Sequence, residues 1–197
     1  FIHARRLGYR CNTAYGPGFA LLPSAAGFVD PLFSTGFPLT LLGIHRLGQA
    51  LQEHGTAIPV STLESYAART SEELADAAFL VDASYAAFPR FQSFADFSMH
   101  YFAAASFAEM ARRLGRGDLA SQFLLGQNAD FRDALRKHGE VALGGGRVDA
   151  GQVAVDLEPF NIAGLCAPEK RNWYGVEGSA VMSMVLEPKP SRAMETR

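Results

Sequence analysis

The sequence has little cysteine, little charge and no surplus of basic residues. Among its 197 residues there are two cysteines, Cys11 and Cys166, and charged residues make up 19%. The two thiols lack the paired spacing of a zinc site or a redox dithiol, so we expect the reducing cytoplasm, with a structural disulfide as the alternative. The formal net charge of -2 argues against nucleic acid and anionic membranes as partners, because their binders carry excess positive charge.

Long apolar runs are also absent. The most apolar segment, Met99 to Ala108, contains His100 and lies between Asp96 and Glu109. It falls well short of the roughly 20 apolar residues that cross a bilayer, so we expect no transmembrane segment. The sequence also lacks an initiator Met and a signal-peptide pattern after Phe1, from which we expect a segment of a longer enzyme.

Apolar residues make up 48% of the chain, which predicts a globular protein with a real core. Residues 1–55 contain the strand signals. The turn Gly16-Pro17-Gly18 separates a partly alternating segment, Leu7 to Tyr15, from the apolar run Phe19 to Leu22, which is typical of a buried strand. A helical pattern then extends from Pro38 to about His54.

Residues 56–197 are predicted to be helical, so the sequence favours a mainly α fold with a few short strands. Ser61 and Glu64 have the spacing of a capping box at the start of a helix that extends to about Ala87. Pro89 interrupts it, and a second helix, apolar on most faces and therefore expected to be buried, extends from Phe91 to Leu114.

Shorter helices are predicted farther along. They cover Leu119 to Leu125, Asp130 to His138 with Asn128 as the N-terminal cap, and Asp149 to Leu157. Gly144-Gly145-Gly146 interrupts this region as a flexible break. The residues from Pro188 onward have the composition of a polar tail.

The segment Leu21 to Pro38 carries the strongest chemical signal. Its small residues Ser24, Ala25, Ala26 and Gly27 would let a ligand approach bare backbone amides. Ser34-Thr35-Gly36 precedes a helix, where unpaired N–H groups and the positive end of the helix dipole favour an anionic or electron-rich partner. Such a site suits a phosphate, a halide or a reduced flavin, and the alternative is an ordinary tight loop and helix cap.

The run from Ala25 to Gly36, AAGFVDPLFSTG, resembles the late FAD-binding motif of flavin-dependent halogenases and related FAD monooxygenases. The stretches from Ala95 to Phe102, from Asn161 to Leu165 and from Arg171 to Tyr174 are more weakly similar to the C-terminal part of halogenase-like proteins. The resemblance implies the C-terminal part of an α/β FAD-binding fold of the group A monooxygenase type. Residues 1–55 would then end the FAD-binding domain, and residues 56–197 would form a helical substrate-side domain.

The resemblance also implies roles for individual positions. The amides near Ala26 and Gly27 would lie against the ribityl and pyrophosphate groups, and those of Gly36 and Phe37 near the electron-rich edge of the isoalloxazine. A halide would lie by the amides of Thr35 and Gly36. The full set of implied cofactor-binding residues is Ser24, Ala26, Gly27, Asp30, Pro31, Ser34, Thr35, Gly36 and Phe37.

This sequence departs from the family pattern at three points. Pro23-Ser24 replaces the family's Gly-Asp, which reduces a ribityl contact to a serine hydroxyl. Phe33 stands where tryptophan halogenases have Glu, as in phenol- and pyrrole-type members. The nucleotide-binding Gly-x-Gly-x-x-Gly, the catalytic Lys and the Trp-x-Trp signature belong to an N-terminal half that this chain does not contain, so we expect the chain by itself to be inactive.

The implied activity is oxidation of an aromatic or other electron-rich small molecule with reduced FAD and oxygen. The implied partners are chloride or bromide, a separate flavin reductase and the N-terminal half of the same enzyme. Whether the reaction is halogenation or hydroxylation stays open. The alternative is a non-catalytic helical interaction module, or a truncated remnant that has lost flavin binding.

Other chemistry is less favoured. The five histidines lack metal-site spacing, so we expect no metal. His100 is predicted either to be a satisfied core histidine or to face a substrate pocket. Ser24 follows a strand, but its neighbours do not form Gly-x-Ser-x-Gly. The phenylalanines from Phe88 to Phe107 are predicted to be core, with lining of an aromatic pocket as the second interpretation.

Overall fold

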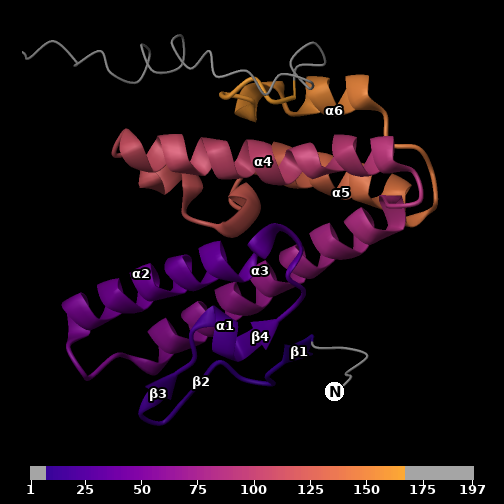
Figure 1. The fold of residues 1–197 in the computed structure, drawn as a ribbon. Helices are drawn as coiled ribbons and strands as arrows, with labels where there is room; N and C mark the ends of the chain where they lie inside the picture. Colours follow the sequence, from indigo (N-terminus) through magenta and orange to yellow (C-terminus); the bar gives the residue numbers. More distant parts are fainter. Residues whose placement is uncertain (1–7, 167–197) are drawn as a thin grey trace, which may run out of the picture.

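Two long helices, α3 (Val60–Ala87) and α4 (Phe91–Arg113), determine the arrangement of the others. The structure, a computed structural model, describes residues 8–166. One end of α3 contacts α1 (Pro23–Ala26) and α2 (Gly36–His54), and α3 also packs against α4 and α5 (Ala129–Leu143). Figure 1 shows two layers, with α2 below and α4 with α5 above, and α3 slanting from one layer to the other. The short helix α6 (Ala150–Asp156) packs on α4 and α5.

The strands are short and form two separate antiparallel pairs. β1 (Tyr9–Arg10) pairs with β4 (Gly27–Phe28), and β2 (Tyr15–Gly16) pairs with β3 (Phe19–Ala20). The predicted turn between β2 and β3 is confirmed, with Gly18 at a φ of 77°. The prediction of a buried strand over Phe19 to Leu22 is wrong. Only its first two residues pair, and Phe19 is 49% exposed, because this hairpin is not covered by a second sheet in the described part of the chain.

The mainly α prediction is confirmed, since helices make up most of the described residues. The predicted bounds of α2, α3 and α4 agree with the structure to within two residues. Gly55, at a φ of 60°, ends α2, and its N–H donates to Leu51 O over 2.9 Å. The domain border near residue 55 stays a prediction, and α3, which begins just after it, contacts elements on both sides.

Two predicted helix starts have opposite outcomes. The capping box at Ser61 and Glu64 is wrong: α3 begins at Val60 after Pro59, without a side-chain cap, and the Ser61 carbonyl accepts from Ser65 Oγ over 2.9 Å. Pro59 already fixes the extended backbone from which the helix starts. The Asn128 cap is confirmed, because its Oδ1 accepts from Phe131 N over 2.9 Å.

The segment between α4 and α5 also differs from its prediction. Instead of one helix over Leu119 to Leu125, two 3₁₀ turns form, η2 (Gly117–Ala120) and η3 (Phe123–Leu125). Leu124 and Leu125 have φ of 50° and 49°, which an α-helix excludes. Asp130 to His138 lies within the longer α5, and α6 with its Asp149 cap confirms the predicted helix there. The remaining 3₁₀ turns are η1 (Leu32–Ser34) and η4 (Glu158–Phe160).

The core lies where α3, α4 and α5 meet. Leu80, Phe97, Phe131 and Leu135 are among its largest buried side chains. Gly139 allows α5 to approach α3 closely, because a Cβ there would lie 2.4 Å from the ring of Phe79. The expected burial of α4 on most faces is only partly observed, since two of its aromatic residues, Phe91 and Phe102, remain exposed.

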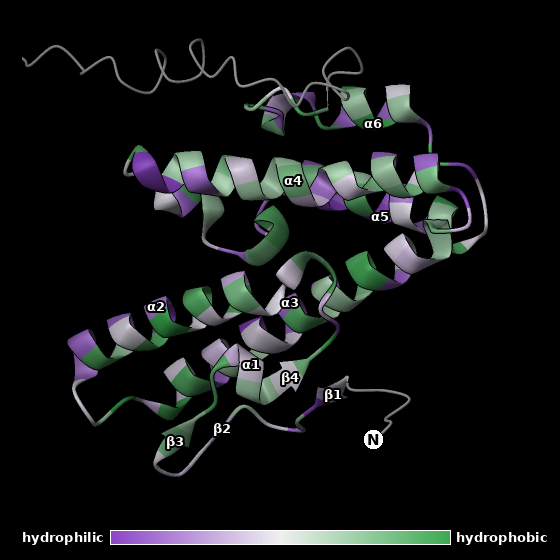
Figure 2. Cartoon of the chain, in the orientation of Figure 1, coloured by the Kyte–Doolittle hydropathy of each residue, from purple (hydrophilic) through white to green (hydrophobic). Residues whose placement is uncertain are grey.

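Phe91 is the more exposed of these residues, with 74% of its surface accessible. Hydrophobic residues recur along α2, α3 and α4 between polar ones (Figure 2). None of the helices between residues 8 and 166 combines the length and the apolar character needed to cross a membrane.

Candidate functional site

The candidate flavin loop leads from α1 through β4 and η1 into the first turn of α2. Asp30 shapes it, because its Oδ1 accepts from Leu32 N over 2.8 Å and closes a tight turn. The Ser34 N–H then donates to Pro31 O over 2.9 Å. Phe33 and Ser34 have φ of 60° and 54°, a conformation that disfavours side chains other than Gly, Asn and Asp. Strained backbone of this kind gathers at functional sites, so this loop is a candidate on geometry as well as on sequence.

The small residues before β4 do not supply bare amides. The N–H groups of Ala25 and Ala26 both donate to Leu22 O over 2.8 Å, and the Gly27 N–H donates to Pro23 O. Gly27 packs closely against α3, because a Cβ there would lie 2.8 Å from Leu74 Cδ1 and would force that side chain to shift. The close approach that we expected of a ligand is therefore made by the protein's own α3.

The start of α2 does provide free donors. The first N–H of this helix that donates to a carbonyl is that of Leu39, to Thr35 O over 3.3 Å. The amides of Gly36 and Phe37 are therefore left at the end of the helix without a backbone acceptor in the described structure. A Cβ on Gly36 would meet no atom within 4 Å. Phe37 is 72% exposed, whereas Thr35 is buried. The positive end of the α2 dipole thus lies at Gly36 and at the exposed Phe37.

A small cavity of about 30 Å³ lies within the loop. Five of the implied cofactor-binding residues line it, together with residues of β4, α2 and α3. The five are Ser24, Gly27, Asp30, Thr35 and Gly36. Such a volume holds one or two water-sized particles. The cavity could hold a small ion beside Thr35 and Gly36, but it is far too small for an isoalloxazine ring. These residues could therefore contact a flavin only as one wall of a larger site.

An aromatic cluster holds the loop against α3 and α4. Phe33 stacks on Tyr101 with ring centroids 4.9 Å apart and lies edge-on to Phe102 at 6.2 Å. The Tyr85 hydroxyl donates to Asp30 Oδ1 over 3.0 Å, and this hydrogen bond raises the pKa of Tyr85. Asp30, an implied cofactor-binding residue, therefore has a structural role that sequence reasoning missed, since nothing in the sequence pairs positions 55 residues apart.

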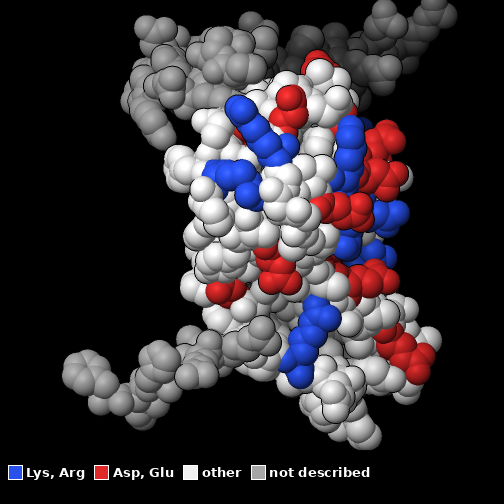
Figure 3. All heavy atoms as spheres, turned by 90° about the vertical axis from the view of Figure 1, so that its right-hand side faces the viewer, with Lys and Arg blue, Asp and Glu red and all other residues white. Residues whose placement is uncertain are grey.

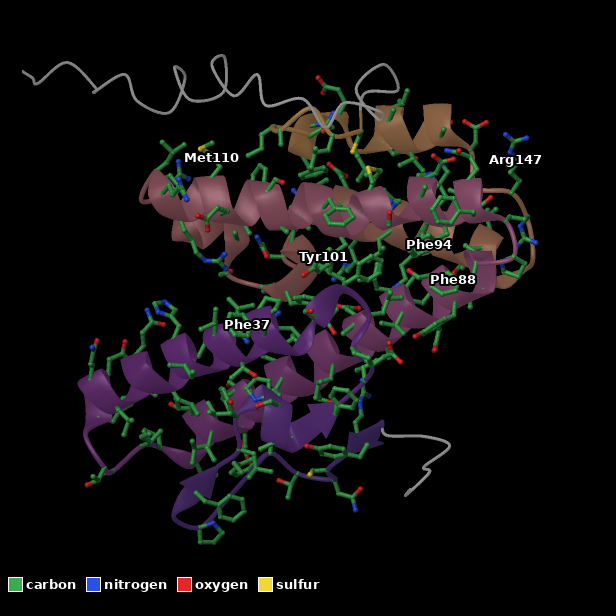
Figure 4. The ribbon with its side chains drawn as sticks, viewed as in Figure 1. Phe37, Phe88, Phe94, Tyr101, Met110 and Arg147 are labelled. Carbon is green, nitrogen blue, oxygen red and sulfur yellow. The ribbon has the colours of Figure 1, made fainter. Side chains whose placement is uncertain are left out.

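An apolar groove of about 130 Å³ adjoins this cluster, between α2, α4 and η3. Pro38 and Leu42 border it from α2, and Tyr101 and Ala104 border it from α4. Figure 4 shows Phe37 on the side of α2 that faces α4, and Tyr101 between the two helices. Of the α4 aromatic residues that we interpreted as possible pocket lining, Tyr101 does line a groove.

The other predicted residues take ordinary places. His100 is fully buried, and its two ring nitrogens lie 2.9 Å from Phe97 O and 3.0 Å from His138 Nδ1. Of the two interpretations of His100, the core histidine is therefore the correct one. Ser24 is exposed, and its carbonyl accepts from Tyr9 Oη over 2.8 Å. No group of three or more His, Cys, Asp or Glu residues in the described ranges could hold a metal ion.

Of the two C-terminal stretches that resemble halogenase-like proteins, only Asn161 to Leu165 lies within the described residues. Asn161 ends η4, and its Oδ1 accepts from Cys166 N over 3.0 Å. No disulfide joins Cys11, which is exposed, to Cys166, which is buried. The stretch from Arg171 to Tyr174 and the polar tail from Pro188 lie outside the described residues.

A wider charged groove of about 560 Å³ lies between α3, α5 and the residues that flank η3, and no pattern in the sequence indicated it. The side chains that line it form ion pairs with each other: Arg136 lies 2.7 Å from Asp76, and Arg69 lies 3.5 Å from Glu72. Burial raises the pKa of Asp76, against the opposing effect of Arg136. Figure 3 shows positive and negative side chains interspersed over this side of the molecule rather than gathered by sign.

Comparison of the chain with known protein families, with curated proteins and with solved structures found no match.

Proposed function

We propose that this chain is the C-terminal portion of an FAD-dependent oxidoreductase of the halogenase or monooxygenase type. The observation that supports this most is the start of α2. Gly36 and Phe37 present free amides at the positive end of a 19-residue helix, and a Cβ on Gly36 would meet open space. Donors at a helix N-terminus stabilise an anion or the negative charge of a reduced flavin.

In this proposal the described residues form one wall of the flavin site. The amides of Gly36 and Phe37 would face the electron-rich edge of the isoalloxazine, and the cavity at Thr35 would accept chloride or bromide. The FAD would supply the oxidising chemistry with oxygen. The apolar groove beside Tyr101 would hold an aromatic or other electron-rich substrate and exclude water from it.

The rest of the proposed enzyme lies elsewhere. The catalytic Lys and the remaining flavin contacts would come from an N-terminal half, and reduced flavin from a separate reductase. A cytoplasmic location accords with two cysteines that form no disulfide with each other.

The experiment uses the complete reading frame that contains this chain. The purified protein is titrated with FAD, and binding is followed by flavin absorbance and fluorescence. The test variant is Gly36→Ala, whose methyl group would occupy the open space, and the matched control is Gly48→Ala, in the same helix and equally open. We expect Gly36→Ala to weaken FAD binding about tenfold, equivalent to about 1.4 kcal/mol, and Gly48→Ala to leave it unchanged.

A complete protein that binds no added FAD, or equal FAD affinity in the two variants, would contradict the proposal. If FAD binds, bromide-dependent mass shifts on phenol and pyrrole substrates separate halogenation from hydroxylation.

The second candidate is a non-catalytic helical interaction module, and one observation favours it. Phe37, Leu41, Ile44 and Leu51 follow one another at helical spacing on α2, and each is at least 50% exposed. An apolar stripe of this kind is typical of a helix that packs against a partner. This candidate predicts association that Leu41→Glu abolishes, measured by light scattering, in a protein that does not bind FAD.

A further inference from the structure

Two buried histidines and a partly exposed aspartate, from three different helices, form a continuous chain. His100 on α4 is fully buried, and its Nε2 lies 3.0 Å from Nδ1 of His138 on α5. His138 is 4% exposed, and its Nε2 lies 3.1 Å from Oδ2 of Asp156, the last residue of α6. None of the three lines the loop or the groove of the proposed flavin site.

The two ends of this chain can only accept hydrogen bonds. At one end His100 Nδ1 lies 2.9 Å from Phe97 O, and at the other His138 Nε2 faces the Asp156 carboxylate. The Ala134 carbonyl, which also faces His100, is another acceptor. Three contacts between two acceptor-only ends need three protons on nitrogen, and two neutral imidazoles carry only two.

The position of the missing proton follows from the geometry. Phe97 O requires a hydrogen on His100 Nδ1, so the neutral His100 accepts at Nε2, and this in turn requires a hydrogen on His138 Nδ1. The lone pair is then left on His138 Nε2, opposite an ionised carboxylate. That nitrogen is buried and is the one ring nitrogen of the pair without a hydrogen-bond partner in the described structure.

We propose that the His100–His138 pair is a proton-binding site, which takes up one proton at His138 Nε2 and shares it with Asp156. The proton supplies the third N–H that these contacts need, on the nitrogen that lies 3.1 Å from Asp156 Oδ2. Because burial lowers the pKa of both histidines, its uptake costs the folded state stability. This proposal does not depend on flavin binding, because it rests on different residues of the fold.

The surroundings place this uptake on the acid side of neutrality. Burial lowers the pKa of both histidines, that of His100 to about 4. Asp156 and Asp149, at the two ends of α6, raise the pKa of His138, and Lys137 on α5 lowers it. Lys137 Nζ also donates to Asp156 Oδ2 over 2.8 Å. The uncharged ring of Phe160 from η4 lies edge-on to Phe131, which in turn lies beside His100. His138, at the Asp156 end, therefore takes the first proton.

The experiment is a pH titration of the chain labelled with ¹⁵N, with the histidine ring nitrogens observed by NMR. We expect both histidines to carry their hydrogen on Nδ1 at pH 7.5. On acidification Nε2 of His138 gains a proton first, and His100 stays neutral to a lower pH. The exposed His45 and His54 provide internal references. A hydrogen on His138 Nε2 in the neutral pair, or protonation of His100 before His138, would overturn the proposal.

Two variants test the roles of the neighbours in opposite directions. Asp156→Asn offers an amide donor to His138 Nε2 and completes the chain without a proton, so the pKa of His138 should fall. Lys137→Gln removes the neighbouring cation without touching the pair, so the pKa of His138 should rise. Far-UV circular dichroism checks that each variant is folded. Shifts of the same sign in the two variants, or no shift in Lys137→Gln, would contradict the assignment.

Discussion

Glu73 illustrates how one residue can take a role that its local sequence does not reveal. It lies within α3, in a stretch of polar residues that is typical of a solvated helix face, yet its side chain is only 3% exposed. Its two carboxylate oxygens accept from Arg46 over 2.6 and 2.7 Å, and Oε1 also accepts from Phe123 N over 2.9 Å. One carboxylate therefore joins α2, α3 and η3.

We predict that Glu73→Ala destabilises the fold by about 3 to 5 kcal/mol, because it leaves Arg46 and the Phe123 amide without their shared acceptor. The matched control is the neighbouring Glu72→Ala. Glu72 has a side chain 65% exposed and lies 3.5 Å from Arg69, so its removal should change stability by less than about 1 kcal/mol. Urea unfolding of both variants measures the difference, and equal losses would contradict the role given to Glu73.

His100 predicts how stability changes with pH. Burial lowers its pKa from 6.5 to about 4, so between these values the unfolded chain binds more protons than the folded one. Stability should therefore be full above about pH 7 and should fall as the pH drops toward 4, by about 3 kcal/mol from this residue. Denaturant unfolding at a series of pH values measures the slope, which His100→Gln should reduce. A slope that His100→Gln leaves unchanged would show that other groups cause it.

At the scale of elements, the same type of signal succeeded at one helix and failed at another. Asn128 caps α5 as predicted, whereas Ser61 and Glu64 form no capping box on α3. A cap needs its residue in an extended conformation just before the first turn. Pro59 provides that conformation at α3, which moves Ser61 into the helix.

This contrast can be measured. We predict that Asn128→Ala destabilises the fold by about 1 kcal/mol, because the Phe131 amide loses its acceptor. Ser61→Ala, at the position where the sequence predicted a cap, should change stability by no more than about 0.5 kcal/mol. Thermal unfolding followed by circular dichroism compares the two, and a larger loss for Ser61→Ala would favour the capping box.

The candidate flavin loop is likewise an element that its neighbours hold in place. Asp30 ties it to Tyr85 on α3, and Phe33 stacks on Tyr101 of α4. These contacts keep Phe33 and Ser34 in their left-handed conformation and thereby fix the direction in which α2 begins. The loop is thus shaped by side chains that lie far away in the sequence.

At the scale of the whole molecule, α3 makes the two layers depend on each other. It contacts α1 and α2 at one end and α4 and α5 farther along. Within residues 8–166, contacts therefore cross the predicted border near residue 55 through α3, whereas few contacts usually cross the linker between two domains.

We predict that the chain unfolds in a single cooperative transition. Hydrogen exchange should report the same urea midpoint for amides of α2 and of α5, because α3 packs against both helices. Circular dichroism, which follows the helices of the whole chain, should give the same midpoint. Two separate midpoints would show that the layers fold independently and would support the predicted border near residue 55.

The sequence alone determined where the long helices lie, because apolar spacing, proline and capping residues act over a few neighbouring positions. It determined the bounds of α2, α3 and α4, the cap at Asn128 and the turn at Gly18. It also pointed to the loop that ends at Gly36. For the same reason it missed the exposure of Phe19 and the two 3₁₀ turns between α4 and α5, since both depend on what packs against them.

Only the tertiary structure decided which charged and polar side chains meet. Arg46 and Glu73 are 27 residues apart and His100 and His138 are 38 apart, and no local pattern relates positions at such separations. The structure also decided that the amides of Ala26 and Gly27 are used by the fold while those of Gly36 and Phe37 remain open. An amide's availability depends on whether a carbonyl lies within hydrogen-bond distance, and the path of the folded chain determines that distance.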